Sequence, residues 1–355
     1  MSSICIDGSH GEGGGQLARM AVALAAITGR TLHLTNIRAG RARPGLMAQH
    51  LAALKAVATL SSGELSGAEP GAREIRFRPG SIRGGDYRFE VGTAGSIALV
   101  LQAVLPVALH ADVPCRFAVT GGTDVKGAPT WDYVQRVFLP WLARLGVEVQ
   151  IESVRHGYYP RGGGEICLTL APCRHLKPLM LDTAGCLRDI RGMAHVARLP
   201  LHIPQRMAAS ARAALADFGP VAIEARVVEE PEACGTGGAL TLVAETEHSL
   251  LGATTVAERG VPAERLGEAA AAALRAEVRS GAALDVHAAD QLLVYLAQAE
   301  GVSRFTVREL SLHARTAIWV TGQFLPVGFD VSHGQGLDRV TVLPRNNEIG
   351  ACRNC

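Results

Sequence analysis

The spacing of apolar residues along the chain changes between the period of a strand and the period of a helix. A short extended apolar segment at residues 4–6 precedes a glycine-rich loop, and Leu17, Met20 and Leu24 then recur on one helical face over residues 16–28. Gly29 suits the end of that helix, because glycine readily adopts the left-handed conformation. A first unit is completed by a strand at 31–37, a helix ending near 60, and strands near 64–67 and 74–78.

The same order of elements recurs twice further along the chain. The second copy is predicted to contain strands 87–91, 115–120, 147–154 and 165–170, with helices 97–110 and 131–145. The third is predicted to contain strands 283–287, 304–312, 328–332 and 339–343, with helices 292–300 and 314–324. The glycine loops of the first two copies lie about 80 residues apart, a spacing typical of one repeated supersecondary unit.

A different pattern separates the second copy from the third. Residues 184–279 predict a strand, a helix at 204–218, two or three strands and an alanine-rich helix at 263–279. We therefore expect an α/β (α+β) fold: three repeated units of a four-stranded sheet with two helices, plus a smaller inserted α/β domain. The expected boundaries are 1–183 with 280–343 for the repeat domain, 184–279 for the inserted domain and 344–355 for a C-terminal tail.

Composition supports a folded protein larger than one small core. The 355 residues are 48% hydrophobic and 19% charged. No window approaches 18 uncharged apolar residues, and the first residues lack the pattern of a signal peptide, so we expect a cytoplasmic protein without a membrane partner. Eight cysteines are scattered along the chain, and the C-x-x-C of Cys352 and Cys355 lacks the second ligand pair that zinc requires.

Charge is informative only where it is local. The net charge is +2, and lysine occurs only three times among 35 basic residues, which indicates a compositional bias toward arginine. Arg38, Arg41 and Arg43 nevertheless cluster at one predicted strand-to-helix joint, where guanidinium groups could bind phosphate bidentately. A solvated basic loop is the alternative; the adjacent glycines and Pro44 shape the loop sharply and favour binding.

The glycine-rich loop at residues 8–16 lies between a strand and a helix. Glycine lets the backbone approach a ligand, and a helix N-terminus favours anions. Residues 13–18 match G-x-G-x-x-A, but the acidic residue of a dinucleotide site is missing about 20 residues later, and a simple tight turn remains an alternative. Glu12, a lone acid in this loop, suits one ligand of a magnesium ion that phosphates also hold.

His313 is predicted to end an apolar strand, at the joint that corresponds to the arginine-rich loop in the repeat. The two joints would then face one crevice, although a structural histidine is an equally good interpretation of the position alone. The chain contains neither a P-loop nor a lysine in K-x-D-G. If the protein attaches a nucleotide to itself, histidine is the available nucleophile.

Several long motifs resemble the RNA 3'-terminal phosphate cyclase family. They are DGSHGEGGGQ at 7–16, IRAGRARPGL at 37–46, FRPG at 77–80, RGGDY at 83–87, GGTD at 121–124 and HGYYPRGGG at 156–164. The resemblance runs from residue 4 to about 343 and is loose only in the inserted segment. It implies ATP-dependent conversion of an RNA 3'-phosphate into a 2',3'-cyclic phosphate, with Mg²⁺ or another divalent cation. RNA with a 3'-phosphate end and ATP are the implied partners.

The resemblance also implies roles for individual residues. His313 matches the adenylylated nucleophile, and Glu12 matches a metal ligand. The positions that match ATP binding are Gln102, His287, Ala288, Ala289, Asp290 and Gln291. The positions that match the RNA-end side are Arg19, Arg38, Arg41, Arg43, Gln49 and His50.

Two departures and three alternatives accompany this interpretation. The chain has His287 where relatives often carry an aromatic residue, and Thr130 where they carry a second proline, so its nucleotide selectivity is open. A non-catalytic RNA-binding assembly factor on the same fold should lack the nucleophile, yet His313, Glu12 and Asp290 are present. An enolpyruvyl transferase-like enzyme has only fold analogy in its favour. An NADP-dependent oxidoreductase has only the G-x-G-x-x-A match and the nearby Arg38.

Overall fold

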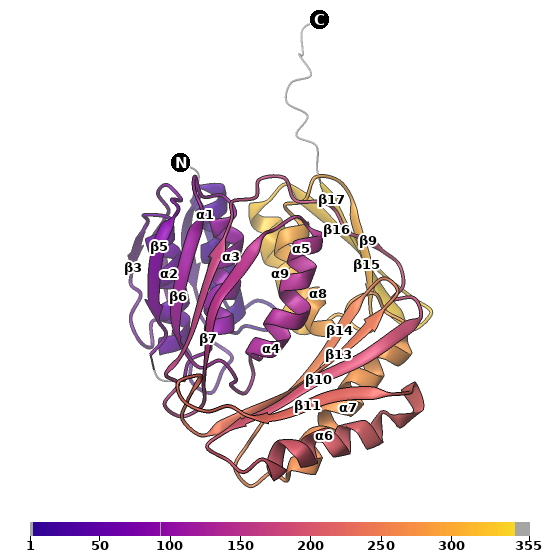
Figure 1. Cartoon of the computed structure of the whole chain (residues 1–355). Coiled ribbons are helices and arrows are strands. Elements are labelled where there is room, and N and C mark those ends of the chain that lie inside the picture. The colour runs from indigo at the N-terminus through magenta and orange to yellow at the C-terminus, as the bar shows by residue number, and fades with distance from the viewer. Residues whose placement is uncertain (1–2, 93, 345–355) are drawn as a thin grey trace, which may run out of the picture.

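The computed structural model describes residues 3–92 and 94–344. It contains four mixed sheets with helices packed against them, so the predicted α/β class is confirmed (Figure 1). Of the predicted tail 344–355, only Pro344 belongs to the described part; Cys352 and Cys355 lie outside it. Within the described ranges, no helix combines the length and apolarity that a membrane crossing requires.

The first sheet has the order β1-β2-β4-β3. Its strands are β1 (Ser3–Asp7), β2 (Thr31–Thr35), β3 (Glu64–Ser66) and β4 (Ile75–Arg78), and its helices are α1 (Gly15–Thr28) and α2 (Ala48–Leu60). Strands β1 and β2 run parallel, and the other pairs are antiparallel. Gly29 ends α1 with φ 66°, as the sequence predicts.

The second sheet has the order β12-β7-β8-β6-β5. Its strands are β5 (Gly85–Glu90), β6 (Cys115–Gly121), β7 (Val149–Gly157), β8 (Gly164–Leu170) and β12 (Ala233–Cys234). Helix α3 (Ile97–Ala108) is followed by α4 (Trp131–Tyr133), a π-helical turn (Val134–Phe138) and α5 (Leu139–Arg144). The predicted single helix is interrupted because Pro140 has no N–H to donate to the preceding turn.

The third sheet has the order β16-β17-β15-β9. Its elements are β9 (Met180–Leu181), α8 (Val286–Leu296), β15 (Ser303–Val307), α9 (Leu312–Phe324), β16 (Val327–Gly334) and β17 (Leu337–Pro344). Apart from β12, these three sheets share one pattern when their strands are counted in chain order. The first strand pairs in parallel with the second, and the fourth strand pairs antiparallel with both the second and the third.

One predicted strand of the third unit is wrong, and another is too long. Residues 283–287 do not form a strand: Asp285 accepts hydrogen bonds from the N–H groups of His287 and Ala288 and so starts helix α8, while β9 takes the expected place beside β15. The strand predicted at 304–312 ends at Val307. Ser311 then caps α9, so His313 stands in the first turn of a helix.

The inserted segment forms a sheet of order β11-β10-β13-β14, with both of its long helices on one face (Figure 1). The elements are β10 (Leu187–Ala197), α6 (His202–Ala214), a 3₁₀ turn (Ala216–Phe218), β11 (Val221–Val227), β13 (Gly237–Thr246), β14 (Leu250–Val256) and α7 (Ala263–Ser280). The apolar side chains between this sheet and its helices make a cluster of their own, while the other three sheets share one continuous core. The exact domain boundaries stay a prediction.

Candidate active site

A cavity of about 660 Å³ opens where the N-terminal ends of α1, α8 and α9 approach α2 and α3. It gathers most of the residues predicted for the site: Glu12, Arg19, Arg38, Arg41, Gln49, His50, Gln102, His287, Asp290, Gln291 and His313. Arg43 does not line it. Ala288 and Ala289 belong to α8, are fully buried in the core and do not line the cavity.

The glycine-rich loop is held against α9. Gly11 and Gly13 have φ of 62° and 59°, and a Cβ on Gly11 would lie 2.4 Å from the hydroxyl of Thr316. That hydroxyl accepts a hydrogen bond from the backbone N–H of Glu12 at 3.0 Å. This contact joins residues 304 positions apart and brings Glu12 beside His313.

His313 is half-exposed and oriented by a hydrogen bond. Its Nδ1 lies 2.7 Å from the amide oxygen of Gln16. An amide oxygen only accepts, so Nδ1 carries the proton and the lone pair is on Nε2. Burial, followed by the positive charges of Arg19 and Arg41, lowers the pKa of His313, which keeps the imidazole neutral and nucleophilic near pH 7.

Glu12 is mostly buried and ion-paired with Arg41 through one carboxylate oxygen. The other oxygen, Oε2, lies 3.9 Å from Nδ1 of His313 and makes no hydrogen bond within the described ranges. A buried carboxylate oxygen without a donor is costly, and a divalent cation would satisfy it. The donor set therefore fits one ligand of a magnesium ion whose other ligands are phosphate oxygens and water.

Positive charge lines the cavity close to His313 and His50. Arg19 is 7% exposed, and burial lowers its pKa to about 10, so its guanidinium stays charged. Arg38 donates to the carbonyl oxygens of Arg43 and Gly45 at 2.8 and 2.7 Å, so part of its role is to shape the loop. Both arginines thus offer positive charge toward the cavity, which is the chemistry that a phosphate group requires.

His50 connects α1 and α2. Its Nδ1 accepts a hydrogen bond from the backbone N–H of Met47 at 3.1 Å, so that nitrogen must be unprotonated. A Cβ on Gly15 would lie 2.1 Å from its Nε2, which explains why glycine stands there. Burial, then the charges of Arg19 and Arg38, lower the pKa of His50 to about 4.

This environment predicts a pH-dependent stability. With a pKa of about 6.5 when unfolded and about 4 when folded, His50 binds a proton mainly in the unfolded state between those values. Its contribution is complete above pH 6.5 and is lost as the pH falls toward 4. When the pH falls from 7 to 4.5, the free energy of unfolding should decrease in both proteins. We expect the decrease to be roughly 2–3 kcal/mol smaller in His50→Gln than in wild type, because the variant has no imidazole to protonate. Urea unfolding at both pH values checks this; equal losses in wild type and variant would contradict it, and the exposed His175→Gln is the matched control.

One face of α8, from His287 to Tyr295, forms another wall of the cavity. Asp290 accepts a hydrogen bond from the hydroxyl of Ser311 at 3.5 Å. Burial, followed by the negative charge of Asp285, raises the pKa of Asp290 well above its ordinary value. A neutral carboxyl group there can donate a hydrogen bond to a ligand. The rings of Tyr133 and Tyr295 also line the cavity, with His287 edge-on to Tyr133 at 6.3 Å between ring centroids. This wall offers apolar surface and a few polar groups, as a nucleotide base requires.

Thr130 does not line the cavity. Its hydroxyl lies 3.0 Å from the hydroxyls of both Thr241 and Thr254, so it joins α4 to the inserted sheet, while Pro129 and Thr254 border the cavity. Sequence reasoning did not assign Gln16, Tyr133 or Thr254 to the site. Gln16 stands in the glycine-rich motif and could have been found there; the other two resemble ordinary core and strand residues.

The site combines a glycine-rich loop at a helix N-terminus, arginines, a neutral histidine and an apolar wall in an α/β fold, which is the chemistry that a ligand with a phosphate group and an aromatic base requires. A sequence model of the family described as RNA 3'-terminal phosphate cyclase matches residues 10–331. The chain therefore belongs to the RNA 3'-terminal phosphate cyclase family, as its motifs indicate.

Relatives of nearly the same length carry that name. A protein named RNA 3'-terminal phosphate cyclase from Nitrosospira multiformis is 53% identical, with 98% of both chains covered. One of that name from Methanosarcina barkeri is 45% identical over 95% of this chain and 99% of its own. Among solved structures, the enolpyruvyl transferase NikO from Streptomyces tendae aligns with 96% of this chain and 48% of its own, at 10% identity and a TM-score of 0.38, too low to support a conclusion.

Proposed function

We propose that this protein converts an RNA 3'-terminal phosphate into a 2',3'-cyclic phosphate with consumption of ATP and release of AMP and pyrophosphate. The observation that carries the proposal is the position of His313, a neutral imidazole that shares one cavity with a buried carboxylate and a group of arginines, in a chain of the cyclase family. The noncatalytic alternative, an RNA-binding assembly factor, gives no reason for a nucleophile in this environment.

In the first step, Nε2 of His313 attacks the α-phosphate of ATP. The proton on Nδ1 stays hydrogen-bonded to the amide oxygen of Gln16. Pyrophosphate leaves as the bond between Nε2 and phosphorus forms. The base would lie against the apolar wall of α8 near His287, with Gln102, Asp290 and Gln291 as polar contacts. A divalent cation held by Glu12 would neutralise charge that develops on the leaving pyrophosphate.

Two further transfers complete the reaction. An oxygen of the RNA 3'-phosphate displaces His313 from the adenylate, which gives an RNA-3'-pp-5'-A end and restores the free imidazole. The adjacent 2'-hydroxyl then attacks the activated phosphate and expels AMP, a step that gains from being intramolecular. Arg19, Arg38 and Arg41 would orient the RNA phosphate, assisted by Gln49, His50 and, at the rim, Arg43. Base sequence need not be read, because the reacting groups are a terminal phosphate and a 2'-hydroxyl.

The decisive assay uses oligonucleotides that differ only at the 3' end. A 3'-phosphorylated RNA should be cyclised only with ATP present, and a 3'-hydroxyl end should be inert. A 3'-phosphate beside a 2'-O-methyl group should stop at the adenylylated end, because the final nucleophile is blocked. Cyclisation without ATP, or RNA binding without any conversion, would contradict the proposal; the second result would favour the assembly factor.

The role of Glu12 gives a separate prediction. Glu12→Gln preserves the size of the side chain but removes its charge. We therefore expect the magnesium concentration for half-maximal self-adenylylation to rise by at least about tenfold, because even the loss of a residue that only supports a metal ligand weakens metal binding by about that factor. The melting temperature should change little, because Arg41 remains solvated. The exposed Glu64→Gln, which removes an ion pair with Arg78, is the matched control. An unchanged magnesium dependence, or unfolding of the variant, would contradict this role.

A further inference from the structure

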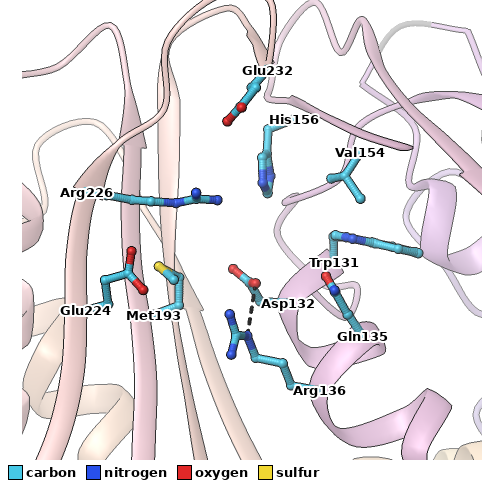
Figure 2. A pocket seen from close by; sticks show the side chains of 10 residues that line it. All are labelled: Trp131, Asp132, Gln135, Arg136, Val154, His156, Met193, Glu224, Arg226 and Glu232. Atoms are coloured by element: carbon cyan, nitrogen blue, oxygen red, sulfur yellow. Dashed lines mark hydrogen bonds and ion pairs between the residues drawn. The ribbon is translucent and has the colours of Figure 1, made fainter. Parts of the chain in front are cut away.

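A second, polar cavity of about 380 Å³ lies between the inserted sheet and the second unit (Figure 2). Arg226, Glu224 and Met193 face it from β10 and β11, while His156 and Asp132 face it from β7 and α4. His156 and Asp132 in turn contact two buried residues, Asp124 and His195, that the proposed reaction does not use. We call Asp124, His156 and His195 the Asp-His-His cluster.

The ligand atoms of the Asp-His-His cluster converge within 4.8 Å of one another, and all three residues are buried. Oδ2 of Asp124 lies 3.0 Å from Nδ1 of His156 and 3.6 Å from Nε2 of His195. Two ligands of a tetrahedral zinc ion, each at about 2.0–2.1 Å, are about 3.3 Å apart. The observed separations lie on either side of that value.

Two buried polar atoms of the cluster, the ring nitrogens of His195, lack a well-aligned hydrogen-bond partner among the described residues. His195 is 0% exposed, and neither of its ring nitrogens makes a well-aligned hydrogen bond to any described residue. Its Nδ1 lies 3.2 Å from Oδ2 of Asp132, which leaves Nε2 directed toward Asp124. A carboxylate behind a histidine ligand is the arrangement that orients imidazole toward a metal. The hydroxyl of Thr123 donates a hydrogen bond of 2.6 Å to Oδ2 of Asp124, the oxygen that faces both histidines, and so fixes its position.

From this geometry we propose that Asp124, His156 and His195 bind a zinc-type divalent ion, with Asp132 and Thr123 as outer partners. Two imidazole ligands favour zinc and similar transition metals over magnesium and calcium, which prefer oxygen. Asp132 is already paired with Arg136 at 3.4 Å through its other carboxylate oxygen, so the divalent ion would mainly balance the buried charge of Asp124. Three protein ligands leave a fourth position for water.

The location gives the ion a structural role. Asp124 follows β6, His156 is on β7 and His195 is on β10 of the inserted sheet, so one ion would tie three distant segments together. The loop that begins at Asp124 continues to Gly127 and Pro129, which border the first cavity. The ion would therefore hold the inserted sheet and one edge of the nucleotide site in a constant relation. It is separate from the cation proposed at Glu12.

The test uses the full chain after treatment with a chelator. Titration with Co²⁺ should give the visible absorption of a tetrahedral site at one ion per chain, and Zn²⁺ should displace it while Mg²⁺ in excess should not. Zn²⁺ should also raise the melting temperature of the chelator-treated protein by about 4 °C or more. His195→Gln and His156→Gln should lose the Co²⁺ signal.

Controls separate this site from other metal binding. His33→Gln removes another histidine–carboxylate pair, at 2.7 Å from Glu74, and should keep the Co²⁺ signal. Glu12→Gln should keep it too. Wild-type protein that shows neither the absorption nor a rise in melting temperature would overturn the proposal, whether or not the variants fold; the cluster would then be an ion-pair network with protonated imidazoles. Full Co²⁺ binding by both cluster variants would overturn it as well.

Discussion

Replacing His313 with asparagine should abolish covalent attachment of AMP and the cyclisation of 3'-phosphorylated RNA together, each by at least about a thousandfold. Asparagine has no nitrogen lone pair that can attack phosphorus, whereas Nε2 of His313 is free for attack because Nδ1 is committed to Gln16. Wild-type protein incubated with ATP and magnesium should gain one AMP through an acid-labile, base-stable phosphoramidate. Intact-mass spectrometry and a labelled oligonucleotide measure the two losses.

The same variant separates nucleophilic catalysis from folding. His313 is half-exposed, so the melting temperature of His313→Asn should stay near that of wild type. It should still cyclise an RNA end supplied already adenylylated, because the attack of the 2'-hydroxyl does not need the imidazole. His175→Asn, which removes an exposed histidine paired with Glu300, should leave both steps unchanged. Wild-type cyclisation of ordinary 3'-phosphate ends by His313→Asn would refute the mechanism.

The largest effect on stability is expected at Asp285. Its carboxylate is 1% exposed and accepts four hydrogen bonds, from the N–H groups of His287, Ala288 and Gly252 and from the hydroxyl of Tyr133. It thereby caps α8 and joins it to β14 and α4. Asp285→Ala leaves four donors unsatisfied; each costs about 1–3 kcal/mol when buried, and with partial relaxation we expect a total loss of about 4 kcal/mol.

Urea unfolding measures that loss, and two variants define its cause. Asp285→Asn retains one acceptor oxygen for three of the donors but places an amide N–H₂ against Gly252, so its loss should be smaller. Asp217→Ala removes an exposed carboxylate bonded to Arg275 and Arg279, and should cost less than about 1 kcal/mol. If Asp285→Ala costs no more than Asp217→Ala, the buried hydrogen bonds do not hold these elements together.

Local sequence determined much of the fold. The apolar periodicity and Gly29 were sufficient to locate α1, because helix formation depends on residues three and four positions apart. Where two local signals competed, periodicity alone was insufficient. The short apolar run at 283–287 suits a strand or a helix equally, and the outcome depended on Asp285, whose capping bonds start α8.

Motifs likewise indicated individual candidate residues but not their arrangement. Glu12, Arg41 and His313 stand out in the sequence as chemistry-bearing residues in glycine-rich or polar contexts. That Arg41 pairs with Glu12 could not be inferred, because the pair depends on how the loop after β2 folds against the glycine-rich loop. That Gln16 orients His313 depends on how α1 packs against α9.

The sequence by itself therefore determined the α/β class, the elements with strong periodicity and the family to which the chain belongs. Only the tertiary structure decided which residues meet. The contact of Thr316 with Glu12 spans 304 positions, and the Asp-His-His cluster unites the loop after β6, strand β7 and the inserted β10. Such contacts arise from strand pairing and helix packing between distant segments, and their energies come from burial and hydrogen bonds that exist only once the chain is folded.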